Sequence, residues 1–319
     1  MGDRHHARRE LGVEFANAIC YSGYREGQSP RDGTYPSYDE VVDDLRILEG
    51  RWRHLRLYDA SRHAELVLEA IRNERLDFRV MLGSDVGAEV NNPGCPWGAD
   101  YPDDELIANR CANSAQIDRM IELANEHADT VFSVSIGNEA TVDWTDHLVP
   151  VESLIEYARR VRQAVAQPVT FCENYVPWTT KLQPLVEELD FISVHTYPVW
   201  EYQPIEHALA YTVQNVRSVS DHYPDIPVVV TEAGWPTNSN GRGIDPEHAS
   251  QELQARYVGE LLEWSRRERV LTFLFEAFDE PWKGSPDPME PEKHWGLFDV
   301  ERRPKRVLQE NAADIAARS

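Results

Sequence analysis

Short runs of apolar and β-branched residues recur eight times along the chain, and segments with helical spacing separate them. Each run has the length expected of a strand that is buried on both faces. The eight runs are residues 13–20, 55–58, 79–82, 132–136, 169–172, 191–194, 228–231 and 271–275. Between them, residues 38–48 and 252–264 place their apolar side chains on one face of a helix. This βα repeat predicts an α/β fold, a single (β/α)8 TIM barrel.

The repeat fills the chain without a linker or a change in composition. We therefore expect residues 1–10 to be a flexible N-terminus and residues 11–319 to form one domain. In a (β/α)8 barrel the functional residues lie at the C-terminal ends of the strands and in the loops that follow them. The sequence thus predicts a cleft at that end of the barrel.

Charge and composition restrict the partners. The formal net charge of −23 argues against nucleic acid and against an anionic membrane as partners. No apolar run is long enough to span a bilayer. Residues 1–10 lack the apolar centre of a signal peptide, which predicts a soluble cytoplasmic protein, or an extracellular one if a leader has been removed. The high charge also favours a monomer.

Two further features of composition leave alternatives open. Only four of the 32 basic residues are lysine, which fits either a protein that stays soluble in high salt or a genome that favours arginine codons. The four cysteines are too few for a disulfide scaffold. Cys95 and Cys111 could pair, but free thiols are the simpler expectation.

Tryptophan is concentrated in the predicted loops. Seven of the nine tryptophans follow strands three to eight: Trp97, Trp144, Trp178, Trp200, Trp235, Trp282 and Trp295. An indole stacks on the CH face of a sugar and leaves the hydroxyls free to form hydrogen bonds. We expect two or three of these rings to pack the loops onto the barrel and the others to line a carbohydrate cleft.

Two glutamates end apolar strands that lie across the barrel mouth from each other. Glu139 follows the fourth strand and Glu232 ends the seventh. Cleavage of a glycosidic bond requires such a pair, one carboxylic acid for the leaving oxygen and one carboxylate for the anomeric carbon. Arg56, in the second strand, and Tyr197, after the sixth, could keep Glu232 ionised.

Three segments resemble glycoside hydrolase family 17, a branch of the large retaining (β/α)8 clan. They are Gly137-Asn138-Glu139, Thr231-Glu232-Ala233-Gly234-Trp235-Pro236 and Phe275-Glu276-Ala277-Phe278-Asp279-Glu280-Pro281-Trp282-Lys283. Near the N-terminus, residues 21–30 resemble the microbial members of the family. The resemblance therefore spans nearly the whole chain.

The resemblance implies a role for several residues. It gives Glu139 the place of the acid/base and Glu232 that of the nucleophile. Asn138 takes the place of an asparagine that contacts the sugar 2-hydroxyl, and Glu280 and Lys283 match residues that line the donor-side sugar sites. Members of the family act on β-1,3-glucans with retention, by hydrolysis or by glycosyl transfer, and need no metal or organic cofactor.

Other residues are predicted to contact the substrate. Tyr197 stands where the clan often has a tyrosine beside the nucleophile, and Arg56 carries a charge into a strand end. Glu276 is predicted in the cleft, although an ion pair with Arg56 or with a neighbouring loop would also explain it. The remaining predicted sugar-binding residues are aromatic: Tyr21, Trp144, Trp235 and Trp282.

The leading hypothesis is a hydrolase of β-1,3-glucan, in which Glu139 acts as the acid/base and Glu232 as the nucleophile. A β-1,3-glucosyltransferase with the same residues is the nearest alternative. A non-catalytic sugar-binding barrel would be expected to have lost one of the carboxylates. The histidines show no metal-ligand spacing, and the choice between endo and exo attack stays open.

Overall fold

Eight parallel strands close into a barrel in a computed structural model that describes residues 17–312 and residue 315. The strands pair in chain order, and β1 (Ala18–Cys20) closes the ring by pairing with both β2 (His54–Leu57) and β8 (Thr272–Leu274). The others are β3 (Arg79–Gly83), β4 (Val131–Asn138), β5 (Val169–Asn174), β6 (Ile192–His195) and β7 (Val228–Ala233). The predicted (β/α)8 barrel is confirmed.

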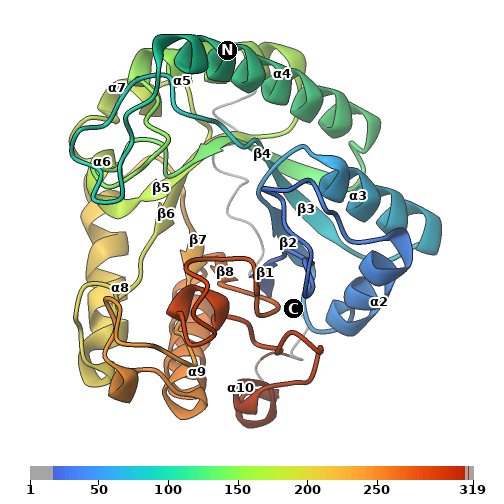
Figure 1. Cartoon of the computed structure of the whole chain (residues 1–319), viewed down its shortest axis with the longest axis vertical. Coiled ribbons are helices and arrows are strands. Elements are labelled where there is room, and N and C mark those ends of the chain that lie inside the picture. The colour runs from blue at the N-terminus through green and yellow to red at the C-terminus, as the bar shows by residue number, and fades with distance from the viewer. Residues whose placement is uncertain (1–16, 313–314, 316–319) are drawn as a thin grey trace.

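Helices surround the strands (Figure 1). The longer ones are α2 (Tyr38–Leu48), α3 (Arg62–Glu74), α4 (Asp103–Glu126), α5 (Val151–Ala164), α8 (Ile205–Ser220) and α9 (Gln251–Glu268). Between β5 and β6 stand two short helices, α6 (Tyr175–Trp178) and α7 (Gln183–Val186), and α10 (Arg306–Glu310) follows β8. Among the described residues, no helix has the length and apolar character needed to cross a membrane.

Local sequence explains where the helices begin. Ser37 precedes α2 and accepts a hydrogen bond from the Glu40 backbone N–H, while the Glu40 carboxylate accepts one from the Ser37 N–H. This reciprocal capping box satisfies two N–H groups that the first helical turn leaves unpaired. Val41, Leu45 and Leu48 then form the buried face of α2, as the apolar spacing predicts.

The strand boundaries differ from the sequence predictions by one or two residues at most strand ends, and β1 and β4 differ most. β1 begins at Ala18, and residues 13–16 of the predicted run lie outside the described residues, as does the predicted flexible segment 1–10. β4 extends beyond the predicted run to Asn138, and its pairing with β5 is irregular between Ser135 and Asn138. Gly137, with a φ of 158°, lies in this irregular stretch.

The four cysteines all lie in the described part of the chain and are free thiols. Cys95 is buried and Cys111 is exposed, so the alternative of a Cys95–Cys111 disulfide is not realised.

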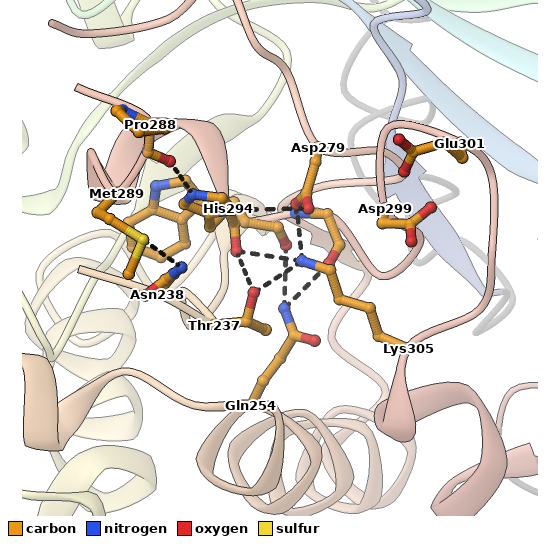
Figure 2. A network of polar contacts seen from close by, with 12 residues as sticks. Thr237, Asn238, Gln254, Asp279, Pro288, Met289, His294, Asp299, Glu301 and Lys305 are labelled. Atoms are coloured by element: carbon orange, nitrogen blue, oxygen red, sulfur yellow. Dashed lines mark hydrogen bonds and ion pairs between the residues drawn. The ribbon is translucent and has the colours of Figure 1, made fainter. Parts of the chain in front are cut away.

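A buried lysine fastens the segment after β8 to the rest of the barrel (Figure 2). The Nζ of Lys305 donates to Asp279 Oδ1 at 2.7 Å and to Thr237 Oγ1 at 2.8 Å. The same Asp279 oxygen accepts from the Gly296 N–H at 2.9 Å. Because Asp279 lies in the loop after β8 and Thr237 lies in the loop after β7, one cation holds both loops in place.

Candidate active site

Glu232, in β7, is held by donors at both of its carboxylate oxygens. Its side chain is 6% exposed. Arg56, from β2, places Nη1 2.5 Å from Glu232 Oε1, and the Tyr197 hydroxyl donates to Oε2 at 2.5 Å. Burial alone would raise the pKa of Glu232. The charges of His195 and Arg56, with the Tyr197 hydrogen bond, outweigh burial and lower the pKa to about 2.

Glu139 follows β4 and is held in a different way. Its φ is +43°, a left-handed conformation that few residues other than glycine adopt. Its backbone N–H donates to the Cys172 carbonyl at 2.9 Å. The Glu139 side chain is 27% exposed, and its Oε1 lies 2.9 Å from His195 Nδ1. The backbone therefore fixes the direction of the side chain, and the carboxyl keeps access to solvent.

His195, which ends β6, joins the two glutamates and was missed in the sequence analysis. Its side chain is fully buried, and its Nδ1 lies 2.9 Å from Glu139 Oε1 and 3.3 Å from Glu232 Oε2. Burial alone would lower the pKa of His195. The charge of Glu232 and the hydrogen bonds with Cys172 and Glu139 raise it to about 10, so the ring is a buried cation.

Asn138 and Arg56 contact each other across the site. Arg56 Nη2 donates to Asn138 Oδ1, and the Arg56 guanidinium also lies over the Tyr58 ring, 4.4 Å from its centroid. The Asn138 backbone carbonyl lies 2.9 Å from His147 Nε2. Among residues 17–312 and 315, no hydrogen-bond partner is found for Asn138 Nδ2. The Asn138 amide is therefore oriented with its NH2 group available to a ligand.

Glu276, Glu280 and Lys283 form one buried cluster after β8. Lys283 Nζ lies 2.8 Å from Glu276 Oε2 and also contacts Glu280. Burial and the charge of Glu280 raise the pKa of Glu276 well above its ordinary value. Burial would raise the pKa of Glu280 as well, but the Lys283 charge lowers it instead. The sequence analysis allowed an ion pair of Glu276 with Arg56 or with a neighbouring loop, and the structure shows the second of these, with Lys283 as the partner.

The aromatic residues divide into a surface set and a buried set. Trp144 is 40% exposed and Trp97 is 60% exposed, and Trp200 and Trp282 are half-buried. The Trp282 Nε1 donates to Glu280 at 3.0 Å. The buried set, at 1% exposure or less, contains three of the seven loop tryptophans: Trp178, Trp235 and Trp295. This division agrees with the expectation that two or three rings pack the loops.

Two of the predicted sugar-binding residues need correction. Trp235 is 1% exposed, packs against Tyr257 with ring centroids 5.5 Å apart, and donates its indole N–H to the His248 carbonyl. Tyr21 is 1% exposed, and its hydroxyl lies 3.3 Å from Asp44 Oδ2. Neither ring has a free face for a sugar, because the loops after β7 and β1 turn these side chains inward.

Two more acidic residues near the site were also missed. Glu173 in β5 is fully buried; burial and the charge of Glu139 raise its pKa to about 7, although hydrogen bonds oppose this. Glu292, after β8, also has its pKa raised to about 7, mainly by burial, although the charge of Lys283 opposes the rise. The strand-end rule that identified Glu139 and Glu232 also applies to Glu173.

The three central residues also resemble a set of metal ligands. One ligand atom from each of Glu139, His195 and Glu232 lies within 4.8 Å of the other two. However, Arg56 and Tyr197 already donate to the two Glu232 oxygens, and His195 is itself cationic. Two buried positive charges disfavour a divalent cation here. The arrangement suits a pair of catalytic carboxyl groups better than a metal centre.

A (β/α)8 barrel with paired glutamates at the ends of β4 and β7 defines a protein of the glycoside hydrolase class. The chain belongs to the family described as the BtgE/BtgC glycoside hydrolase domain, whose family model matches residues 18–296.

Two known proteins of similar sequence come from fungi. A probable glucan endo-1,3-beta-glucosidase of Aspergillus clavatus is 25% identical over 298 residues, which cover 86% of this chain and 40% of that protein. A glucan 1,3-beta-glucosidase of Schizosaccharomyces pombe is 25% identical over 284 residues, 83% of this chain and 79% of that protein. The chain thus spans well under half the length of the Aspergillus protein.

Solved structures with the same fold come from a bacterium and a fungus. An endo-laminarinase from Formosa has a TM-score of 0.81 and 26% identity, covering 95% of this chain and 88% of that chain. An active-site mutant of the Rhizomucor miehei beta-1,3-glucanosyltransferase, in complex with laminaritriose, has a TM-score of 0.71 and 22% identity, covering 93% of this chain and 97% of that one. The second likeness concerns the fold alone.

Proposed function

We propose that this chain is a member of glycoside hydrolase family 17 that hydrolyses β-1,3-glucan with retention of configuration. The observation that carries the proposal is the pair of glutamates at the barrel mouth, one kept ionised and the other partly exposed. Oxygens of the two carboxyl groups lie within 4.8 Å of each other. This supports retention, because inverting enzymes separate the two groups by about 6.5–9.5 Å to admit a water molecule.

The chemistry then follows from the two environments. Glu139 protonates the departing glycosidic oxygen while Glu232 attacks the anomeric carbon, which yields a glycosyl-enzyme and a shortened glucan. Glu139, now ionised, removes a proton from water, and the resulting hydroxide displaces Glu232 and releases a β-configured sugar. Arg56, Tyr197 and His195 keep Glu232 ionised and oriented for both steps.

Several residues are proposed to bind the sugar. The free NH2 group of Asn138 supports a hydrogen bond to the 2-hydroxyl beside the nucleophile. Glu280, Lys283 and Trp282 line the donor side, and Glu276 supports them through Lys283.

Substrate identity is supported by the named activities of the similar proteins, a glucan endo-1,3-beta-glucosidase and an endo-laminarinase. A non-catalytic sugar-binding barrel is disfavoured because both carboxyl groups are present. Arg56 and Tyr197 contact Glu232, and His195 contacts Glu139.

Glycosyl transfer is the second candidate function, and exposed aromatic residues favour it. Trp97 lies in the loop after β3, and Trp144 lies in the loop after β4 that begins at Glu139. Cys95 Sγ contacts the Trp144 carbonyl at 3.3 Å, which ties these two loops together. The leaving group departs beside Glu139, so an acceptor sugar stacked on Trp144 would compete with water for the glycosyl-enzyme.

Linear β-1,3-gluco-oligosaccharides of defined length test the proposal. Mass spectrometry would follow product length, and NMR would follow the anomer that forms first. Shorter products that appear first as the β-anomer are expected. Products longer than the substrate would assign the chain to the transferase function, and first release of the α-anomer would refute retention. An unchanged substrate would refute both candidate functions.

A further inference from the structure

The segment that carries Glu139 adopts a conformation that other contacts must maintain. A left-handed backbone at a residue other than glycine costs about 1–3 kcal/mol and persists only where the surroundings hold it. Glu139 has this conformation, and its N–H bonds to Cys172 of β5. The next residue, Ala140, accepts a hydrogen bond from the Val149 N–H at 2.9 Å. The residue after that, Thr141, forms hydrogen bonds with Glu173 near the end of β5.

Glu173, in β5, holds Thr141 through hydrogen bonds. Its Oε2 accepts hydrogen bonds from the Thr141 N–H at 2.9 Å and from the Thr141 hydroxyl at 2.7 Å. Its Oε1 accepts from the Asn174 N–H at 2.7 Å. On the other side, Lys181 Nζ donates to the Thr141 carbonyl at 2.5 Å. Thr141 is thus fixed at its N–H, hydroxyl and carbonyl.

Glu173 is 0% exposed, so it does not reach a sugar in the cleft. A buried carboxylate must gain hydrogen bonds from the protein in place of those it loses with water, because transfer of an ionised group from water is costly. Here all three donors belong to the backbone or the hydroxyl of Thr141 and Asn174, and none is a charged side chain. The function of the Glu173 carboxylate is therefore to bind this backbone.

We propose that Glu173 is a positioning residue for the acid/base: by holding Thr141, it keeps Glu139 in its left-handed conformation and its carboxyl directed at the glycosidic oxygen. This inference rests on the proposed function. The charge of Glu139 also raises the pKa of Glu173, as expected of two carboxyl groups near each other.

Glu173→Gln is the sharpest test because both carboxylate oxygens of Glu173 accept hydrogen bonds. The amide of glutamine must set its NH2 group against the Thr141 donors or against the Asn174 N–H, whichever way it turns. At least one donor then loses its acceptor, and the Thr141 segment is expected to shift.

The readout is a comparison of two substrates. Laminaritetraose needs a proton on its leaving oxygen, whereas 2,4-dinitrophenyl β-laminaribioside has a leaving group that departs without one. A misplaced acid/base should lower kcat/KM for laminaritetraose about 10- to 100-fold. For the aryl substrate we expect a change of less than about threefold, because kcat/KM reports the step that needs no acid.

Glu89→Gln is the control. Glu89 is also a buried carboxylate with three neutral hydrogen-bond donors, Tyr157, Asn113 and Ser153. It differs from Glu173 in that it also pairs with the exposed Arg110, and it contacts neither glutamate of the site. It should leave the ratio of the two kcat/KM values unchanged. Thr141→Val removes only one donor, so it should shift the ratio in the same direction as Glu173→Gln, by less.

The outcomes are distinct. An equal fall on both substrates, or no fall, in a Glu173→Gln protein that unfolds at the wild-type temperature would overturn the inference. If Glu173→Gln does not fold, Thr141→Val decides, and an unchanged ratio there would also overturn it. A wild-type protein inactive on both substrates would refute the proposed function itself.

Discussion

The two glutamates of the site share a barrel mouth and differ in how the protein holds them. Glu232 is held at its carboxylate oxygens by Arg56 and Tyr197, and its side chain is 6% exposed. Glu139 is held through its backbone and by one contact of its Oε1 with His195, and its side chain is 27% exposed. In the proposed mechanism, the carboxylate that must stay ionised is thus stabilised at both of its oxygens. The carboxyl that must gain and lose a proton is fixed mainly through its backbone, and its side chain keeps access to solvent.

The most severe test removes the carboxylate that is held at its oxygens. Glu232→Ala should lower turnover of laminari-oligosaccharides about 10⁴-fold or more, because no other group can attack the anomeric carbon. The unfolding temperature and the circular dichroism spectrum should show that the barrel remains folded. Azide, placed in the space left by the side chain, should restore turnover of an aryl glycoside and give the α-azide. More than a few per cent of residual activity would mean that Glu232 is not the nucleophile.

Removal of the Glu139 carboxyl should lower kcat/KM by an amount that depends on the leaving group of the substrate. Glu139→Ala should lower kcat/KM on laminari-oligosaccharides by roughly 10²- to 10⁴-fold. On 2,4-dinitrophenyl β-laminaribioside the fall should be far smaller, and azide should yield the β-azide. If Glu139→Ala and Glu232→Ala gave the same azide anomer, the division of roles between the two glutamates would be refuted.

Arg56 is expected to affect both pH dependence and stability. The pKa of Glu232 is lowered from 4.5 to about 2. Glu232 therefore contributes stability that is present above about pH 4.5 and is lost as pH falls toward 2. Arg56→Met removes one of the charges that lower this pKa, so the acid limb of the kcat/KM profile should move to higher pH. The free energy of unfolding at pH 7 should fall by about 3–5 kcal/mol, because a buried charge loses its partner.

A surface arginine provides the control for Arg56→Met. Arg256 pairs with Glu260 on α9, and its side chain is 43% exposed. Arg256→Met should change the free energy of unfolding by about 0.5 kcal/mol or less and leave the pH profile unchanged. An acid limb that stays in place after Arg56→Met would mean that Arg56 does not set the ionisation of Glu232.

The smallest expected effect concerns a single hydrogen bond. Tyr197→Phe removes the hydroxyl that donates to Glu232 Oε2 and should lower kcat about 10-fold, with little change in KM. Tyr211→Phe removes a hydroxyl that bonds to the Tyr175 hydroxyl, outside the site, and should have no effect on kcat. Equal kcat values for Tyr197→Phe and wild type would show that Arg56 and His195 suffice to orient the nucleophile.

The strand pattern in the sequence predicts the barrel and also the residues at the C-terminal ends of its strands. Parallel strands bring their C-terminal ends to one face, so residues distant in the chain, such as Arg56 and Glu232, can be placed together from the strand pattern. Asn138 was predicted from the family resemblance and not from the strand pattern. His195 and Glu173 occupy equivalent strand ends. A short apolar run does not reveal which of its last residues faces the barrel axis, because that depends on register, and register is set by pairing with the neighbouring strands.

The loops were less predictable than the strands. The sequence predicts both Trp97 and Trp235 in loops, yet Trp97 is 60% exposed and Trp235 is 1% exposed. Local sequence identifies a loop but does not specify which way it folds over the barrel. The same limit applies to Lys283, which the loop after β8 returns to the barrel mouth between Glu276 and Glu280.

The pairing of β1 with β8 has a consequence for synthesis of the protein. The ring closes only when residues near the start of the domain meet residues that the ribosome adds more than 250 positions later. Contacts of such sequence separation form late. The nascent chain therefore carries Glu139 and Glu232 well before it has a barrel that can align them. If these residues act as proposed, we expect glucan cleavage to begin only after translation of β8.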